Sequence, residues 1–342
     1  MAVNLTQTTK QAERAVLRAF TESIQSVKDQ AVIKELAALI DARDIEGAVN
    51  LLQLDPATFR PLENAITAAY EEGGAVGAAQ IGRIPVESGT LVARFNVRNP
   101  RAEEWLRTLS STRIVEIADE TKAVVRSVLT ESLAQGQGPR TAALDLVGRI
   151  DPQTRNRVGG YIGMTENQAR WAANARRELN ELDPAYLDRA LRDKRLDAAF
   201  KKAIEQGKPL TNRQIDTAIS RLQARTIRYR GETISTTETL NALRAGQEEA
   251  IRQATETGEL ESEFATKEWQ DTGDGRTRPD HAAADGQTVP IDQPFIVGGY
   301  QMMRPGDSSM GAPASQVIRC RCRASYRMSF SGQAAKEIRG FG

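Results

Sequence analysis

The chain has 342 residues, and its 46 lysines and arginines nearly balance its 45 aspartates and glutamates, leaving a formal net charge of +1. A balanced chain has no overall basic field that could hold nucleic acid through its phosphates, so any such contact would have to be local. The length exceeds what a single hydrophobic core usually serves, and we expect two or more structural units.

The N-terminal residues, Met1 to Gln7, lack the basic-then-apolar order of a secretory signal. No uninterrupted apolar run approaches the roughly 20 residues that a membrane span needs. We therefore expect no membrane span, and a soluble protein that begins in the cytoplasm of the cell that makes it.

Aromatic residues make up 5% of the chain and charged residues 27%, a mixture common in long solvent-facing helices. The sequence therefore predicts a mainly α fold. An elongated multi-helix body over residues 1–230, which can be subdivided near residues 100 and 160, is followed by a small α+β C-terminal domain of short strands over residues 231–342.

The first half shows helical spacing of apolar residues over residues 9–42 and 113–133. Asp55-Pro56 and Asn99-Pro100 are typical helix starts, because the Asp or Asn side chain can accept an orphan N–H and proline suits the first turn. Residues 78–97 lie between these helices and end in alternating apolar residues, which predicts a short hairpin or arm.

Two capping boxes mark further helix starts, one at Thr165 with Gln168 and one at Thr211 with Gln214. Helical spacing follows the second box and resumes over residues 234–257, which we expect to form a leading helix of the C-terminal domain. Glycine, proline and aspartate then become frequent, and short apolar stretches predict a small β-rich part over residues 264–328.

This last part contains both cysteines of the chain, Cys320 and Cys322, and its only histidine, His281. Cysteines so close in sequence cannot easily bond to each other, which excludes a disulfide scaffold. On an extended strand, positions i and i+2 would place both sulfurs on one face. Together with His281 they would supply three zinc ligands, and Asp280 or Asp285 could provide the fourth.

The alternative is that the cysteines are small buried apolar groups and that His281 hydrogen-bonds a carboxylate or a carbonyl. Cys-x-Cys spacing is less typical of zinc sites than Cys-x-x-Cys, which favours this alternative. Zinc is the one cofactor that the sequence suggests.

Arginines flank this set on both sides. Arg276 and Arg278 stand beside several aspartates and can pair with them internally, or can contact DNA phosphates or an acidic partner. The balanced charge favours internal pairing. Arg319, Arg321 and Arg323 would share the strand face opposite the cysteines, either solvated or in contact with DNA or a partner.

A characteristic order of residues runs through this region: Trp269, Arg276, Arg278, His281, Gly286, Phe295, Pro305, Cys320 and Cys322. This order resembles the C-terminal module of Mu F-like phage head-morphogenesis proteins. The resemblance is strong over roughly the last third of the chain and loose before it. Arg319 stands where that family commonly has asparagine, which leaves the local hydrogen bonding of the closing strand open.

The resemblance implies a minor structural protein of a tailed-phage head. Such a protein acts in head morphogenesis by binding the portal protein, the major capsid or scaffolding protein, or the inner capsid surface, and it can leave the head with the DNA. The implied location is the virion, with the host cytoplasm as the place of assembly and packaged DNA as a further contact.

Two other functions stay open at this point. A phage-borne effector enzyme, such as a toxin or a nuclease-like protein, could use His281 with Asp285 and Arg278 for acid–base chemistry. A DNA-binding head protein could use the arginines around the cysteines. Because the chain has one histidine, no nucleophile elbow and no phosphate-binding loop, we expect no enzyme.

Overall fold

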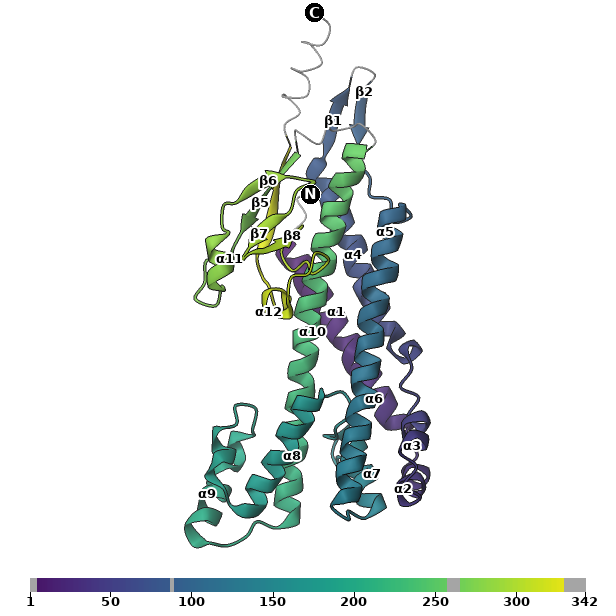
Figure 1. Ribbon diagram of the computed structural model, residues 1–342, viewed down its shortest axis with the longest axis vertical. Coiled ribbons are helices and arrows are strands. Elements are labelled where there is room, and N and C mark those ends of the chain that lie inside the picture. The colour runs from purple at the N-terminus through teal and green to yellow at the C-terminus, as the bar shows by residue number, and fades with distance from the viewer. Residues whose placement is uncertain (1–4, 87–88, 257–264, 329–342) are drawn as a thin grey trace, which may run out of the picture. The chain divides into compact units, whose positions relative to one another are not determined.

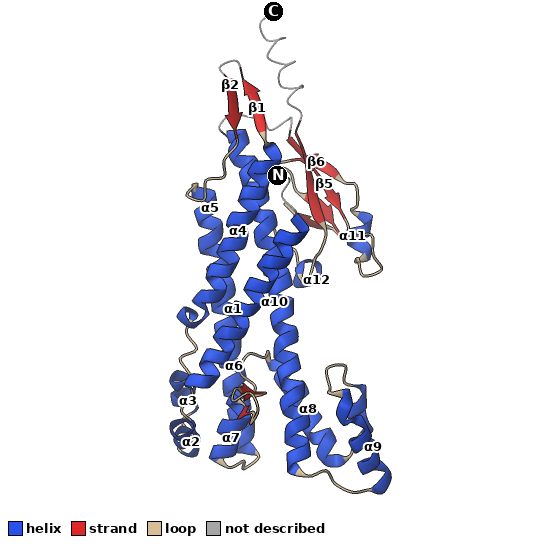
Figure 2. Ribbon diagram, turned by 180° about the vertical axis from the view of Figure 1, so that it is seen from behind, coloured by secondary structure: helices blue, strands red, loops and turns tan. Residues whose placement is uncertain are grey.

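The computed structural model describes residues 5–86, 89–256 and 265–328. Helices dominate it, and small antiparallel sheets of short strands follow toward the C-terminus (Figures 1 and 2). This confirms the predicted mainly α fold with a small α+β part at its end. Within the described residues, no helix has both the length and the hydropathy that a membrane span requires.

The chain divides into two compact units, each built from segments that are distant in sequence. Unit 1 contains residues 1–17, 63–111 and 233–342, and unit 2 contains residues 18–62 and 112–232. The boundary expected between residues 230 and 231 lies inside one helix, α10 (Asn212–Glu256). The helix predicted over residues 234–257 is therefore the second half of a longer one.

Unit 2 is almost entirely helical. Besides the second part of α1 (Leu5–Gln30) and the first part of α10, it contains α2 (Ile33–Asp41), α3 (Ile45–Leu51), η1 (Pro56–Phe59), α6 (Ser111–Ala134), α7 (Pro139–Val147), α8 (Glu166–Glu181), η3 (Pro184–Asp188), η4 (Lys194–Leu196), α9 (Asp197–Gln206) and the short strand pair β3 (Arg149–Ile150) and β4 (Arg157–Val158).

Both predicted capping boxes begin helices of unit 2. At α8 the Thr165 hydroxyl accepts a hydrogen bond from the Gln168 backbone N–H at 3.3 Å, and the Gln168 side chain accepts one from the Thr165 N–H at 3.1 Å. Thr211 and Gln214 make the same exchange at 3.3 and 2.8 Å, where α10 begins. These contacts satisfy first-turn donors, so both helix starts are determined locally.

Unit 2 also buries a lysine. Lys28 on α1 is 4% exposed, and its Nζ donates to the Gly159 carbonyl oxygen at 2.8 Å. Burial lowers the pKa of Lys28 to about 7, and the neighbouring Asp29 carboxylate opposes this shift. The folded protein therefore favours the neutral amine at this position.

Unit 1 combines helices with a hairpin. Its helical parts are the start of α1, α4 (Arg60–Ile81), α5 (Pro100–Trp105), the π-helical η2 (Leu106–Ser110) and the end of α10. The hairpin predicted within residues 78–97 is confirmed as β1 (Arg83–Val86) and β2 (Gly89–Val92), which pair antiparallel. At α5 the Asn99 side chain accepts from the Arg101 N–H at 3.0 Å, as expected for a cap.

Small residues let α4 and α10 approach closely. A Cβ atom built on Gly246 would lie 2.0 Å from the carbonyl oxygen of Tyr70, and one built on Gly73 would lie 2.0 Å from that of Leu243. Real Cβ atoms do not approach another heavy atom so closely. Any side chain at either position would therefore push the two helix backbones apart.

The C-terminal module (residues 265–328) belongs to unit 1. Its elements are β5 (Ala265–Gln270), α11 (Pro279–Ala283), β6 (Thr288–Pro290), β7 (Phe295–Val297), β8 (Tyr300–Met302), α12 (Ala314–Val317) and β9 (Arg323–Met328). One antiparallel sheet has the strand order β6-β5-β9, and β7 pairs with β8. β5 is the central strand, and its buried Trp269 and Ala265 alternate with half-buried residues.

The carboxylate of Glu248 on α10 ties the module to this helix. Glu248 is 2% exposed, and Oε1 accepts from Lys267 Nζ of β5 at 3.1 Å, while Oε2 accepts from Arg304 Nη1 at 3.2 Å. Lys267 is fully buried, and its Nζ also donates to the Met303 carbonyl at 2.6 Å. Both cations are buried charges that need this carboxylate.

We expect Glu248→Ala to destabilise the protein by about 3–5 kcal/mol, because it leaves Lys267 and Arg304 buried without their shared carboxylate. The change would be measured as the free energy of unfolding in urea. Glu104→Ala is the matched control, because Glu104 pairs with Arg107 on the surface of the same unit and should contribute little. Equal losses in both variants would contradict this role of Glu248.

We expect the Lys28→Met variant to differ from wild type in a pH-dependent way. Between about pH 7 and about pH 10 the unfolded chain holds a proton on Lys28 that the folded chain has released, so wild-type stability rises with pH across this window. Lys28→Met removes that contribution, so its stability relative to wild type should be highest near pH 7 and should decline toward pH 10.

The measurement is urea unfolding of both proteins at several pH values. Exposed Lys34 on α2 provides the control Lys34→Met, whose pH profile should run parallel to that of wild type. A constant difference between Lys28→Met and wild type across the window would refute the prediction.

Candidate metal centre

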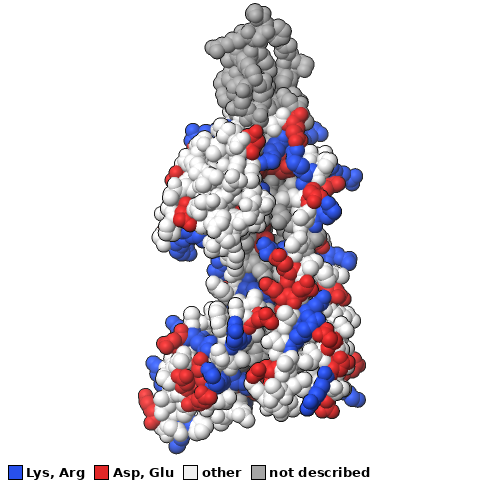
Figure 3. Space-filling model, in the orientation of Figure 1, with Lys and Arg blue, Asp and Glu red and all other residues white. Residues whose placement is uncertain are grey.

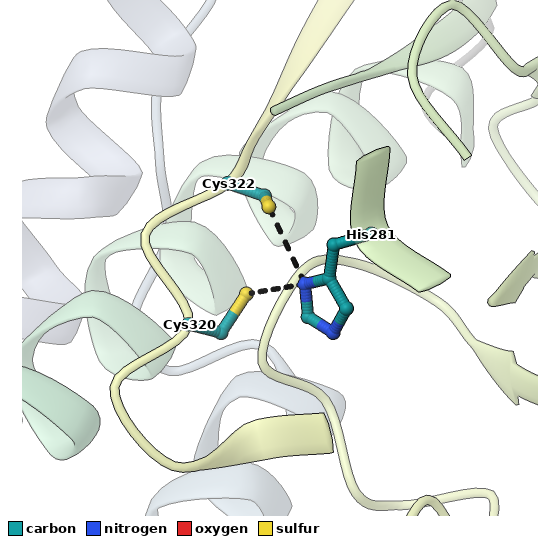
Figure 4. Close-up of side chains that lie close together, drawn as sticks. All are labelled: His281, Cys320 and Cys322. Carbon is teal, nitrogen blue, oxygen red and sulfur yellow. Dashed lines mark hydrogen bonds between the residues drawn. The ribbon is translucent and has the colours of Figure 1, made fainter. Parts of the chain in front are cut away.

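The histidine and both cysteines meet in the core of the C-terminal module (Figure 4). His281 lies on α11, and the cysteines lie in the segment between α12 and β9. The expectation that both cysteines occupy a strand is wrong, because β9 begins only at Arg323. Arg319 adopts a left-handed backbone conformation with φ of 53°, and the irregular segment after it still brings both sulfurs to the imidazole.

The contacts converge on one nitrogen atom. His281 Nδ1 lies 3.4 Å from the Cys322 sulfur and 3.6 Å from the Cys320 sulfur. The three potential ligand atoms all lie within 4.8 Å of one another. His281 and Cys320 are each 1% exposed and Cys322 is 3% exposed, so the cluster is closed to bulk solvent.

A chain of hydrogen bonds determines which ring nitrogen of His281 carries the proton. The Gln316 amide Nε2 donates to Asp280 Oδ2 at 2.7 Å, since an ionised carboxylate can only accept. Gln316 Oε1 then faces His281 Nε2 at 2.9 Å and must accept from it. The proton therefore resides on Nε2, and the Nδ1 lone pair points at the two sulfurs.

The carboxylates considered as a fourth ligand lie outside this cluster. Asp280 accepts from Gln316, on the far side of the imidazole from the sulfurs. Asp285 Oδ1 accepts from the Asp271 backbone N–H at 2.8 Å. Neither belongs to the group of potential ligands within the described residues. Asp280 instead orients the histidine through Gln316.

Aromatic rings enclose the cluster. Trp269 contacts the His281 ring edge-to-face, with centroids 5.4 Å apart, and it contacts Phe295 in the same way at 5.4 Å. Trp269 and Phe295 are both fully buried. Gly286 has a φ of +76° and donates its N–H to the Trp269 carbonyl at 2.9 Å. These motif residues therefore build the walls of the site.

Sequence reasoning missed Arg244 of α10, which is buried beside the cluster. Its Nη1 donates to the Pro305 carbonyl at 3.0 Å, and its Nη2 donates to the Cys320 carbonyl at 3.1 Å. Pro305 of the motif thus contributes a backbone acceptor. No local pattern marks Arg244, because its helix shows only regular spacing and its partners lie more than 60 residues away.

The two thiols differ in how readily they lose a proton. The hydrogen bond from the Cys322 thiol lowers the pKa of Cys320, and the positive charge of Arg244 adds to this effect. The pKa of Cys322 is raised by the hydrogen bond of Cys322 to Cys320 and by the burial of Cys322.

The arginines around the cluster have partners within the module. The Asp274 carboxylate accepts from Arg276 Nη2 at 3.1 Å and from Arg321 Nη2 at 2.8 Å. The hydrogen bond from Arg321 is the main cause that lowers the pKa of Asp274 to about 2. Arg278 donates to the Ile318 carbonyl, and Arg323 donates to the Gln270 side chain at 2.8 Å. Internal pairing thus accounts for the contacts of these four arginines.

Arg319, Arg321 and Arg323 do not share one strand face as expected, because only Arg323 lies in β9. The Arg319 backbone N–H donates to the Thr237 hydroxyl of α10 at 3.0 Å. This contact settles one point that the sequence left open: the residue before the Cys-Arg-Cys segment is anchored through its backbone.

Comparison with known proteins gives a match to one family model. Residues 194–325 match the family model described as phage Mu protein F like protein, and the match includes Trp269, His281 and both cysteines. No curated protein and no solved structure matches the chain. The match begins upstream of the expected module, at η4 of unit 2. Residues 194–325 of this chain are therefore similar to phage Mu protein F like protein.

Proposed function

We propose that this protein is a minor structural component of a tailed-phage head and acts in head assembly through protein contacts. The observation that carries the proposal is the match of residues 194–325 to the phage Mu protein F like family, which is a family of phage head-morphogenesis proteins. The protein would then be located in the virion, after assembly in the host cytoplasm.

The portal protein or the inner capsid surface is the partner we favour, with the major capsid or scaffolding protein as the other candidates. The face of the module seen in Figure 3 carries few charged side chains. Large apolar side chains are exposed on the module, among them Ile296 of β7 at 49% and Tyr300 of β8 at 42%. Exposed apolar surface of this kind supports docking onto another protein.

The contacts of the candidate acid–base residues argue against the enzyme alternative. His281 is 1% exposed and has contacts at both ring nitrogens. Asp285 accepts from a backbone N–H, and Arg278 donates to a backbone carbonyl. These side chains support the loops of the module, where a substrate would have no access to the imidazole.

The DNA-binding alternative depends on arginines that already have partners. Arg321 pairs with Asp274, and Arg323 donates to Gln270. Contacts to phosphate would have to compete with these bonds, which favours a structural use. If the chain binds DNA and this binding weakens steeply as the salt concentration rises, the result would support the DNA-binding alternative.

The test is quantitative mass spectrometry of purified, DNA-filled particles, with this chain counted against the portal and major capsid proteins. We expect a small reproducible number of copies per particle. Complete absence of the chain from the particles would reject the proposal and favour an assembly factor or an effector. The same count on emptied particles reports whether the chain leaves with the DNA.

A variant pair tests the docking face. Ile296→Asp places a charge among the exposed apolar side chains of β7 and β8, and we expect it to lower the number of copies per particle several-fold without changing the helix content of the purified chain. Val115 of α6, 43% exposed and outside the module, provides the control Val115→Asp, which should be incorporated normally. Equal incorporation of the two variants would exclude this face as the docking surface.

A further inference from the structure

We propose that His281, Cys320 and Cys322 bind one zinc ion, which holds α11 and the segment between α12 and β9 together. This inference goes beyond the proposed function and is independent of it. It concerns a metal that stabilises the module and has no part in catalysis.

The distances match a tetrahedral site. With Zn–S bonds of about 2.3 Å and a Zn–N bond of about 2.0–2.1 Å, tetrahedral angles place each sulfur about 3.6 Å from the nitrogen. The distances from His281 Nδ1 are 3.4 Å to Cys322 and 3.6 Å to Cys320. An ion bonded to Nδ1 and to both sulfurs therefore fits these two distances, and the three atoms all lie within 4.8 Å of one another.

The Nδ1 lone pair is directed at the place that a metal would occupy. Because Nε2 carries the proton, Nδ1 presents one lone pair to two sulfurs. A cation at the point where all three atoms converge would satisfy the nitrogen and both sulfurs at once.

The surrounding groups are those that a zinc-bound histidine requires. Zinc ligands of this type usually donate their other ring N–H to a carboxylate or a carbonyl, which fixes the ring orientation. Here His281 donates to the Gln316 carbonyl oxygen, and Gln316 donates to Asp280. Arg244 of α10 donates to the Cys320 backbone carbonyl at 3.1 Å, which fixes the backbone that carries this ligand.

The balance of charge also favours the ion. Two thiolates and one Zn²⁺ have no net charge together, so the complex can stay buried at a smaller cost than free thiolates. Among the histidine, cysteine and carboxylate side chains of the described residues, the cluster supplies three ligands. Burial of all three side chains keeps larger molecules from a fourth coordination position.

The experiment uses the full chain, purified under reducing conditions without a metal-affinity column. We expect elemental analysis to give about one zinc per chain, and almost none in Cys320→Ser, Cys322→Ser or His281→Asn. Replacement by Co²⁺ should produce thiolate-to-cobalt absorption in wild type, which each cysteine variant should weaken or lose.

Two further variants separate ligand loss from general damage to the core. Met302→Leu changes a fully buried residue of the same apolar core and should keep the zinc. Gln316→Leu removes the acceptor for His281 Nε2 and should weaken zinc affinity about 10- to 100-fold without abolishing binding. Chelation should lower the melting temperature of wild type and Met302→Leu but leave that of Cys322→Ser unchanged.

The proposal is overturned if the reduced, chelator-treated wild-type chain keeps its helix content yet takes up neither Zn²⁺ nor Co²⁺. It is equally overturned if both cysteine variants retain one zinc per chain. Neither outcome changes the particle count that tests the proposed function.

Discussion

The complete burial of α10 between residues 241 and 250 is the constraint on which the rest of unit 1 depends. On one side, Gly246 lets the backbone of α4 approach so closely that no side chain could fit. On the other, Glu248 and Arg244 reach into the C-terminal module. A helix covered on every face must bury polar groups, and these groups then need partners from other segments.

Two of the buried charged residues of α10, Arg244 and Glu248, explain how the module is positioned. The Glu248 carboxylate pairs with Lys267 of β5 and with Arg304. The Arg244 guanidinium donates to the backbone carbonyls of Pro305 and Cys320. The backbone at Cys320 is therefore anchored to α10 before any metal binds. A cluster supported in this way is preorganised, and the cost of bringing its ligands together is already met by folding.

The chemistry-bearing residues of the module serve its structure. Its histidine, both cysteines and Trp269 are buried together, and Arg321 and Asp274 pair with each other. What the module presents outward includes the apolar side chains of β7 and β8. The interior of the module is closed, since His281 and both cysteines are almost completely buried.

The sequence by itself determined the features whose causes are local. The capping boxes at Thr165 and Thr211 and the hairpin within residues 78–97 depend on neighbours a few residues apart. Only the tertiary structure decided the irregular path of the cysteines, the tautomer of His281 and the roles of Arg244 and Glu248. Each of these depends on partners many residues away, and such contacts leave no periodic trace in the chain.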